Sequence, residues 1–176
     1  MKQRSILWQA AGFAVATFGG TILHFLYDWT GGNILAAPFS GVNESTWEHM
    51  KLLFWPLFLF ALVQRLFFRN QENYWCVKLT QILLGLVLIS VLFYTYNGVF
   101  GKSPDWINIA IFYISAALVF LFERWAFKRN QLLCKYPRVF WAAICLIGAL
   151  FVVFTFMPPH IPLFQDPISG GFGISI

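Results

Sequence analysis

The chain has 176 residues, of which 59% are hydrophobic and 11% are charged, and its formal net charge is +5. Such an apolar composition excludes an ordinary soluble domain, which needs more charged residues to cover its surface. It predicts a membrane protein, because a transmembrane helix needs roughly 20 mostly apolar residues and the chain contains several runs of that length.

In chain order, the apolar runs predict five transmembrane helices joined by short loops. The runs cover about 5–27, 49–68, 77–96, 106–125 and 139–157. Lys2 and Arg4 before the first run also fit a signal peptide, but the run continues to Tyr27, so a retained helix is predicted. We therefore expect an all-α, polytopic bundle with residues 1–176 in a single transmembrane domain.

Positive charges are divided unequally between the two ends of the predicted helices. One end carries only Lys51 and Lys102, whereas the other carries Lys2, Arg4, Arg65, Arg69, Lys78, Arg124, Lys128, Arg129, Lys135 and Arg138. Because cytoplasmic loops are enriched in Lys and Arg, the N-terminus is predicted to lie in the cytoplasm and the C-terminus outside. This asymmetry, together with contact to anionic lipid, explains the positive net charge, so no nucleic-acid partner is expected. We expect a multi-pass protein of the cell membrane.

The three cysteines avoid the predicted outer face. Cys76 and Cys134 lie at cytoplasmic helix ends, and Cys145 lies within the fifth predicted helix. Because the cytoplasm is reducing, no disulfide is expected. The chain also has no CxxC spacing, which excludes the common thiolate zinc sites.

Ionisable side chains that suit catalysis gather in the predicted outer layer, which holds all three histidines of the chain. At the end of the first helix, His24 and Asp28 are four residues apart and share one helix face. Gly12, Ala16 and Gly20 extend this spacing toward the N-terminus, and such stripes of small residues mark close helix packing in lipid. The face that carries His24 is therefore predicted to point into the bundle.

The loop before the second helix holds a second group of candidates. Ser45 and Glu48 have the spacing of a capping box, which gives both a structural explanation. Glu44 and Glu48 are four residues apart, an unfavourable pair unless a cation, a proton or a partner intervenes. Ser45 and His49 also admit a nucleophile–base pair, although no nucleophile-elbow sequence surrounds Ser45. Asn43 completes the polar set of this loop.

The third group lies in the tail that follows the fifth predicted helix, where His160 and Asp166 occur among four prolines. The prolines predict an extended or turning segment rather than a helix. The glycines near the end of the tail are typical of a flexible, exposed C-terminus, although they would also let backbone N–H groups approach an anion.

Histidine, aspartate and glutamate supply the nitrogen and oxygen ligands that Zn²⁺ and other divalent cations accept. The expected metal ligands are His24, Asp28, His49 and His160, with Glu44 or Glu48 as the general base. Further candidate site residues are Asn43, Ser45 and Asp166. No fixed-spacing zinc motif such as HExxH supports this set. A structural polar cap is the alternative, in which these groups prefer the interface to hydrocarbon and Lys51 pairs with a carboxylate.

Three segments of the outer layer, HFLYDWTGGN, VNESTWEHMKLLFWP and PPHIPLFQDPISGGFGI, give the chain a resemblance to a known group of proteins. Through them the chain resembles an uncharacterised family of small bacterial integral membrane proteins, known only as a domain of unknown function. The resemblance runs from the first helix to the tail. It implies a multi-pass protein of the bacterial cytoplasmic membrane and implies no activity.

The function expected from these residues is metal-dependent hydrolysis at the outer leaflet. A site at the depth of the head groups favours a lipid-linked or amphiphilic substrate, and a bound metal lowers the pKa of its water toward about 7. A proton- or cation-coupled transporter is the first alternative, but such proteins usually have repeats and sites near the bilayer midplane. A non-enzymatic accessory subunit of a larger membrane assembly is the second.

Overall fold

The computed structural model describes residues 2–129 and 134–174, with side chains from residue 6 onward. Within these ranges the chain is all-helical, and the five predicted transmembrane helices are confirmed. They are α1 (Lys2–Trp29), α2 (Thr46–Phe67), α3 (Tyr74–Phe100), α4 (Asp105–Arg129) and α5 (Pro137–Phe156), followed by a short 3₁₀-helix, η1 (Pro162–Phe164). Each of the five is long and apolar enough to cross a bilayer.

Most helices extend beyond the apolar runs that predicted them. α3, for example, covers Tyr74–Phe100, where the apolar run covers only 77–96. At the bilayer surface, water and head groups satisfy polar side chains, so helical turns can continue past the hydrocarbon. α2 begins at Thr46 because the Ser45 side chain accepts a hydrogen bond from the Glu48 N–H at 3.4 Å, as the capping-box spacing predicts.

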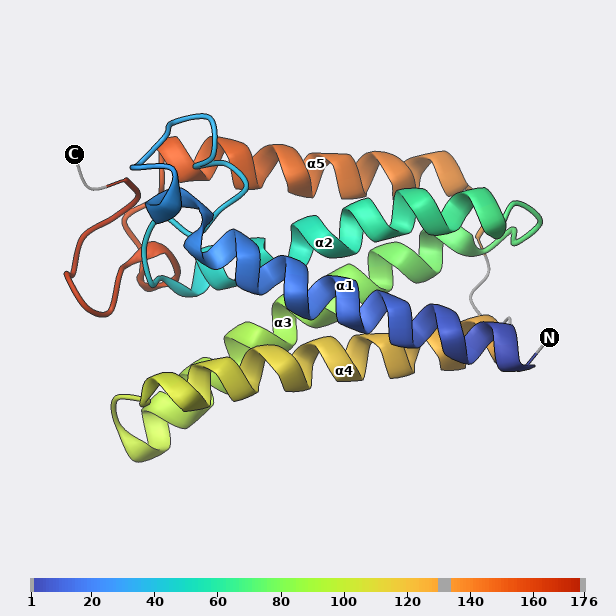
Figure 1. The fold of residues 1–176 in the computed structure, drawn as a ribbon, viewed down its shortest axis with the longest axis horizontal. Helices are drawn as coiled ribbons and strands as arrows, with labels where there is room; N and C mark the ends of the chain where they lie inside the picture. Colours follow the sequence, from blue (N-terminus) through green and yellow to red (C-terminus); the bar gives the residue numbers. More distant parts are fainter. Residues whose placement is uncertain (1, 130–133, 175–176) are drawn as a thin grey trace.

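The five helices form a bundle (Figure 1). Among the described residues, α2 has the largest buried share. α1 packs against α2 and α4, and α3 packs against α2, α4 and α5. Figure 1 shows the two chain ends at opposite ends of the bundle, and it shows α1 and α4 diverging toward the end that holds the C-terminus. We call this the C-terminal end of the bundle. Its predicted location outside the cell stays a prediction.

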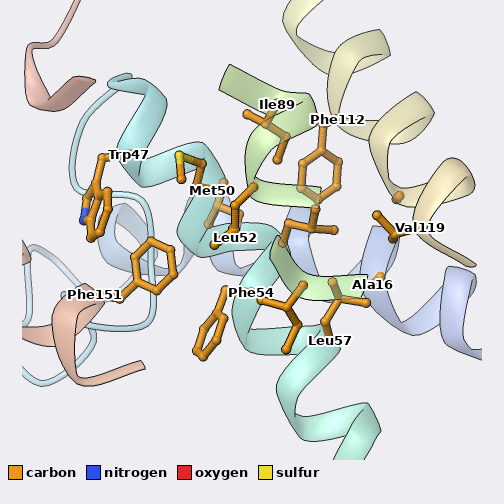
Figure 2. Packing of buried hydrophobic residues seen from close by; sticks show 14 of the residues in the cluster. Ala16, Trp47, Met50, Leu52, Phe54, Leu57, Ile89, Phe112, Val119 and Phe151 are labelled. Atoms are coloured by element: carbon orange, nitrogen blue, oxygen red, sulfur yellow. The ribbon is translucent and has the colours of Figure 1, made fainter. Parts of the chain in front are cut away.

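The core between the helices is built from tightly packed apolar side chains (Figure 2). Ala16, Leu53 and Val119 are fully buried there. The predicted close packing of the small residues on α1 is confirmed at Gly20, where an added Cβ would contact Phe112 and lie 3.1 Å from the Leu52 carbonyl oxygen. Gly20 therefore lets α1 approach both α2 and α4.

One cysteine expectation is wrong. Cys76, at the start of α3, forms a disulfide with Cys134, which precedes α5, and the two Cα atoms are 5.9 Å apart. The expectation rested on compartment alone. The structure brings both residues to the same end of the bundle at a separation that suits a disulfide. Cys145 is free and exposed.

Apart from η1 the tail is extended or turning, as its prolines predict, but residues 158–174 pack back onto the bundle instead of remaining free. Phe164 of η1 is buried between Trp47 and Phe154, with ring centroids 4.6 and 5.4 Å away. The aromatic contacts replace exposed apolar surface with packed surface, which offsets the entropy of ordering the tail. The tail thereby becomes a wall of the C-terminal end.

Candidate functional site

Three candidate residues from separate segments meet at the C-terminal end of the bundle. The Glu44 carboxylate lies between two imidazoles, with Oε1 3.8 Å from His24 Nε2 and Oε2 3.5 Å from His49 Nε2. The side chains of His24, Glu44 and His49 are 31%, 40% and 21% exposed, so all three are partly accessible. We call these three residues the His–Glu–His cluster.

The hydrogen bonds of His49 determine what its second nitrogen can do. His49 Nδ1 lies 3.0 Å from the Ser45 carbonyl oxygen, which can only accept a hydrogen bond. Nδ1 therefore carries a proton, and in the neutral ring Nε2 is an acceptor that faces the Glu44 carboxylate, a second acceptor. Two acceptors face one another favourably only when a proton lies between them. The contact between His49 and Glu44 is therefore an ion pair only when the His49 ring carries a second proton.

His24 is positioned where α1 meets the loop that follows it. The Ser40 hydroxyl donates to the Leu23 carbonyl and accepts from the Tyr27 N–H at 2.8 Å. Gly41 N–H also donates to the Leu23 carbonyl, at 3.2 Å. A Cβ on Gly41 would lie 3.4 Å from His24 Nδ1, an ordinary van der Waals distance, so the loop lies directly beside the imidazole.

The Glu44 backbone is held between the loop and the tail. Asn43 Oδ1 accepts from the Ser45 N–H at 2.9 Å, and Asn43 Nδ2 donates to the Gly173 carbonyl at 2.9 Å. Asp166 of the tail accepts a hydrogen bond from the Glu44 N–H. Asn43, Ser45 and Asp166, predicted as further site residues, therefore surround Glu44 as positioning groups.

Asp166 is itself fixed as a carboxylate. Partial burial acts to raise its pKa, but hydrogen bonds from the Ser169 hydroxyl and from the backbone N–H groups of Ile168, Ser169 and Glu44 outweigh that effect and lower the pKa below its ordinary value. The ionised carboxylate is therefore part of the structure that links the tail to Glu44.

A cavity of about 540 Å³ opens beside the His–Glu–His cluster. Its walls come from α1, α2, α4, the Glu44 loop and the tail, in the region where α1 and α4 diverge in Figure 1. Apart from the three cluster residues it is lined by Gly20, Thr21, Phe25, Leu52, Asp105, Asn108, Ile109, Phe112, Tyr113 and Ile168. The volume lies within the range of small-molecule sites, and the lining combines one polar end with several apolar side chains.

A smaller cavity of about 100 Å³ adjoins the first, since His24, Phe25 and Glu44 line both. Asp28 lines the smaller cavity, on the helical face that it shares with His24. Asp105, Asn108 and Tyr113 of α4 were not among the predicted site residues. The sequence marks only Asp105 of these three, as an acidic residue at the outer end of a predicted helix.

Glu48 is placed differently from Glu44. It is 3% exposed, its Oε2 lies 2.5 Å from Lys51 Nζ, and it accepts from the Val42 N–H at 3.1 Å. Lys51 also donates to the Ala37 carbonyl at 2.8 Å and to the Thr155 hydroxyl at 3.0 Å. This buried pair joins the loop to α2 and α5, as the structural alternative for Lys51 anticipates, and Glu48 does not line the cavity.

The contacts of His160 differ from those of the other two histidines. Its ring packs against Phe172, 4.6 Å between centroids, and it is not among the described residues that line either cavity. In the part of the chain that the structure describes, no group of three or more His, Cys, Asp or Glu side chains is placed to hold a metal ion. The predicted ligands His24, Asp28, His49 and His160 thus form no coordination group, and metal binding stays a prediction.

A second buried charge cluster lies at the opposite end of the bundle, which we call the N-terminal end. Glu123 of α4 pairs with Lys78 of α3, and the two side chains are 0% and 1% exposed. Gln9 Nε2 donates to Glu123 at 3.1 Å, and Lys78 donates to Gln81 at 3.1 Å. The ion pair therefore joins α3 to α4, and Gln9 links α1 to it.

Comparison with known proteins gives one match. The family described as "Family of unknown function (DUF6512)" matches residues 1–174, which is nearly the whole chain and agrees with the resemblance to an uncharacterised family. No curated protein and no solved structure matches the chain.

Proposed function

We propose that this chain, which belongs to the family of unknown function DUF6512, is a membrane enzyme that hydrolyses an amphiphilic substrate by acid–base catalysis. The observation that carries the proposal is the Glu44 carboxylate between two imidazoles at the polar end of a 540 Å³ cavity. Catalytic acids and bases need positioned groups that can exchange a proton with the substrate. The His–Glu–His cluster supplies both kinds.

The position of the cavity favours an amphiphile. Ile109 of α4 and Phe25 of α1 line the cavity and are also 59% and 43% exposed on helices long enough to span a bilayer. Exposed side chains of such helices face lipid, so a molecule can reach the cavity from within the membrane. Its apolar part would lie against Leu52, Ile109 and Phe112, and its polar part would meet Glu44.

The cluster supports a specific division of roles. Glu44 as the general base would take a proton from water, and the resulting nucleophile would attack an acyl carbon of the substrate. The bond between the acyl carbon and the leaving-group oxygen would then break, and a protonated imidazole at His24 or His49 would give its proton to that oxygen. Asn43, Ser45 and Asp166 would act as positioning residues because they hold the backbone on either side of the Glu44 side chain.

The test compares the hydrolysis of p-nitrophenyl dodecanoate and p-nitrophenyl acetate by detergent-purified protein. We expect a preference for the long-chain ester, and a loss of about 10²–10⁴-fold in rate in Glu44→Gln, because a positioned general base contributes about that factor. The control is Glu72→Gln, which removes an exposed carboxylate from the loop between α2 and α3. Equal rates in Glu44→Gln and the wild type would contradict the proposal.

A further inference from the structure

The charges around the two cavities are unevenly distributed. Glu44 and Asp105 line the larger cavity, and Asp28 and Glu44 line the smaller one. Glu44 lies within 3.8 Å of His24 and of His49, so its charge is compensated when either imidazole is protonated. Asp28 and Asp105 have no such partner among the residues that line the cavities, so the polar end keeps a net negative charge.

Positive side chains are absent from these walls, since none of the described residues that line either cavity is a lysine or an arginine. Lys51 on α2 is fully buried and is held by Glu48, Ala37 and Thr155. Lys102 lies in the turn between α3 and α4 and lines neither cavity. An anionic head group would therefore meet carboxylates without a fixed cation to bind it.

Aromatic side chains line the same space. Phe25, Phe112 and Tyr113 contribute to the larger cavity beside Asp105 and Glu44. Aromatic faces attract ammonium groups, and the attraction grows where water is excluded. Carboxylates combined with aromatic rings are the chemistry that recognises a substituted ammonium group rather than a phosphate.

From these observations we infer that the cavity selects amphiphiles with a cationic, ammonium-type head group. The inference rests on the proposed function and narrows its substrate class. The ammonium group lies near Asp105 and the aromatic rings, and the apolar chain leaves between α1 and α4 toward the lipid. Asp105 then determines specificity, whereas the His–Glu–His cluster performs the chemistry.

The test uses three probes with one chain length, namely dodecyltrimethylammonium, dodecyl phosphate and dodecanol. Their binding to the full-length protein is measured in nanodiscs made of an uncharged galactolipid, so that no lipid phosphate or choline competes. We expect dodecyltrimethylammonium to bind at least about tenfold more tightly than the other two, because the Asp105 carboxylate has no compensating cation among the residues that line the larger cavity. Asp105→Asn reduces this preference, and the matched control Glu72→Gln leaves it unchanged.

Two further outcomes separate the inference from the proposed function. Ile109→Trp places a larger side chain at a lipid-exposed position of the cavity wall, and it weakens binding of all three probes if the cavity is the site. If dodecyl phosphate or dodecanol binds as tightly as the ammonium probe, the inference fails but the proposed function does not. The same holds if Asp105→Asn leaves the preference for the ammonium probe unchanged. If Ile109→Trp affects no probe, the cavity is not the site, and the inference and the proposed function both fail.

Discussion

Both ends of the bundle contain a buried ion pair, Lys78–Glu123 at one and Lys51–Glu48 at the other, but the C-terminal end also carries an accessible cluster. At the N-terminal end, Lys78 and Glu123 are almost completely buried and bond to Gln9 and Gln81. At the C-terminal end, His24, Glu44 and His49 remain partly exposed beside a cavity. A buried pair with its own partners holds helices together, whereas an accessible cluster can exchange protons with a ligand. Access, rather than charge, separates the scaffold from the candidate site.

The largest expected effect concerns the N-terminal end. Lys78→Met leaves Glu123 as a buried charge without its cation, which costs about 3–5 kcal/mol of stability. The double variant Lys78→Met with Glu123→Met recovers most of the loss, because an apolar pair needs no compensation. Unfolding in mixed detergent micelles measures the stability of the single and the double variant.

The comparison variant for that experiment is His49→Gln, at the accessible cluster. It should lose far less stability than Lys78→Met, since water reaches the cluster and replaces the lost contact. If Lys78→Met unfolds no more easily than the exposed-lysine variant Lys102→Met, the pair at the N-terminal end does not act as scaffold.

A smaller effect is expected where the scaffold meets the cavity. Gly20→Ala places a methyl group against Phe112 and the Leu52 carbonyl, which requires α1 to move. Overpacking of this kind costs about 1–3 kcal/mol, and a displaced Phe112 also narrows the cavity. Thermal unfolding and binding of a dodecyl probe in the same preparation test both consequences.

Gly98→Ala is the matched control for Gly20→Ala. Gly98 also lies inside a helix, but an added Cβ there has no atom within 4 Å. Alanine should therefore be neutral or stabilise α3 by about 0.5–1 kcal/mol. Equal effects of the two substitutions would show that α1 is not closely packed at Gly20.

The sequence predicts the scaffold better than the cavity, because the helices depend on residues that are close in sequence and the cavity depends on residues that are far apart. Each transmembrane helix follows from the local run of apolar residues, and the start of α2 follows from the local cap at Ser45. His24, Glu44 and His49 were correctly assigned to one layer because membrane depth restricts where they can lie. Their exact grouping was not predictable, and His160 shows why, since its place depends on how the tail folds.

The cavity itself could not be predicted, because it depends on how closely α1 and α4 approach. The stripe of small residues marks Gly20 as a packing position, but it does not show that Phe112 of α4 packs there. The disulfide between Cys76 and Cys134 contradicts the expectation for a different reason, because that expectation rested on the predicted cytoplasmic location of both residues. Its two cysteines are 58 positions apart, and only the fold shows that they meet.

The smallest expected effect concerns the tail that positions Glu44. Hydrogen bonds lower the pKa of Asp166, so the folded tail is stabilised above the ordinary pKa of an aspartate, and this contribution is lost as the pH falls through the lowered value. We therefore expect the tail to stay attached down to about pH 4 and to loosen below it. Asp166→Asn should loosen it at neutral pH by about 1 kcal/mol.

Hydrogen exchange of the tail amides measures the loosening at low pH and in Asp166→Asn. Glu72→Gln removes one carboxylate at the opposite end of the bundle and is the control for the change in net charge. If the tail exchanges equally fast in the wild type and in Asp166→Asn, Asp166 does not hold the tail to the Glu44 loop.

The central claim is that the C-terminal end of the bundle holds an amphiphile between α1 and α4, and photocrosslinking tests it most directly. A diazirine analogue of dodecanol is irradiated with the protein in lipid vesicles, and the labelled peptides are identified by mass spectrometry. We expect labels concentrated near Phe25 of α1 and Ile109 of α4, and we expect excess unlabelled dodecanol to suppress them. Labels spread evenly over the lipid-facing surfaces, α5 included, and unaffected by competitor would contradict it.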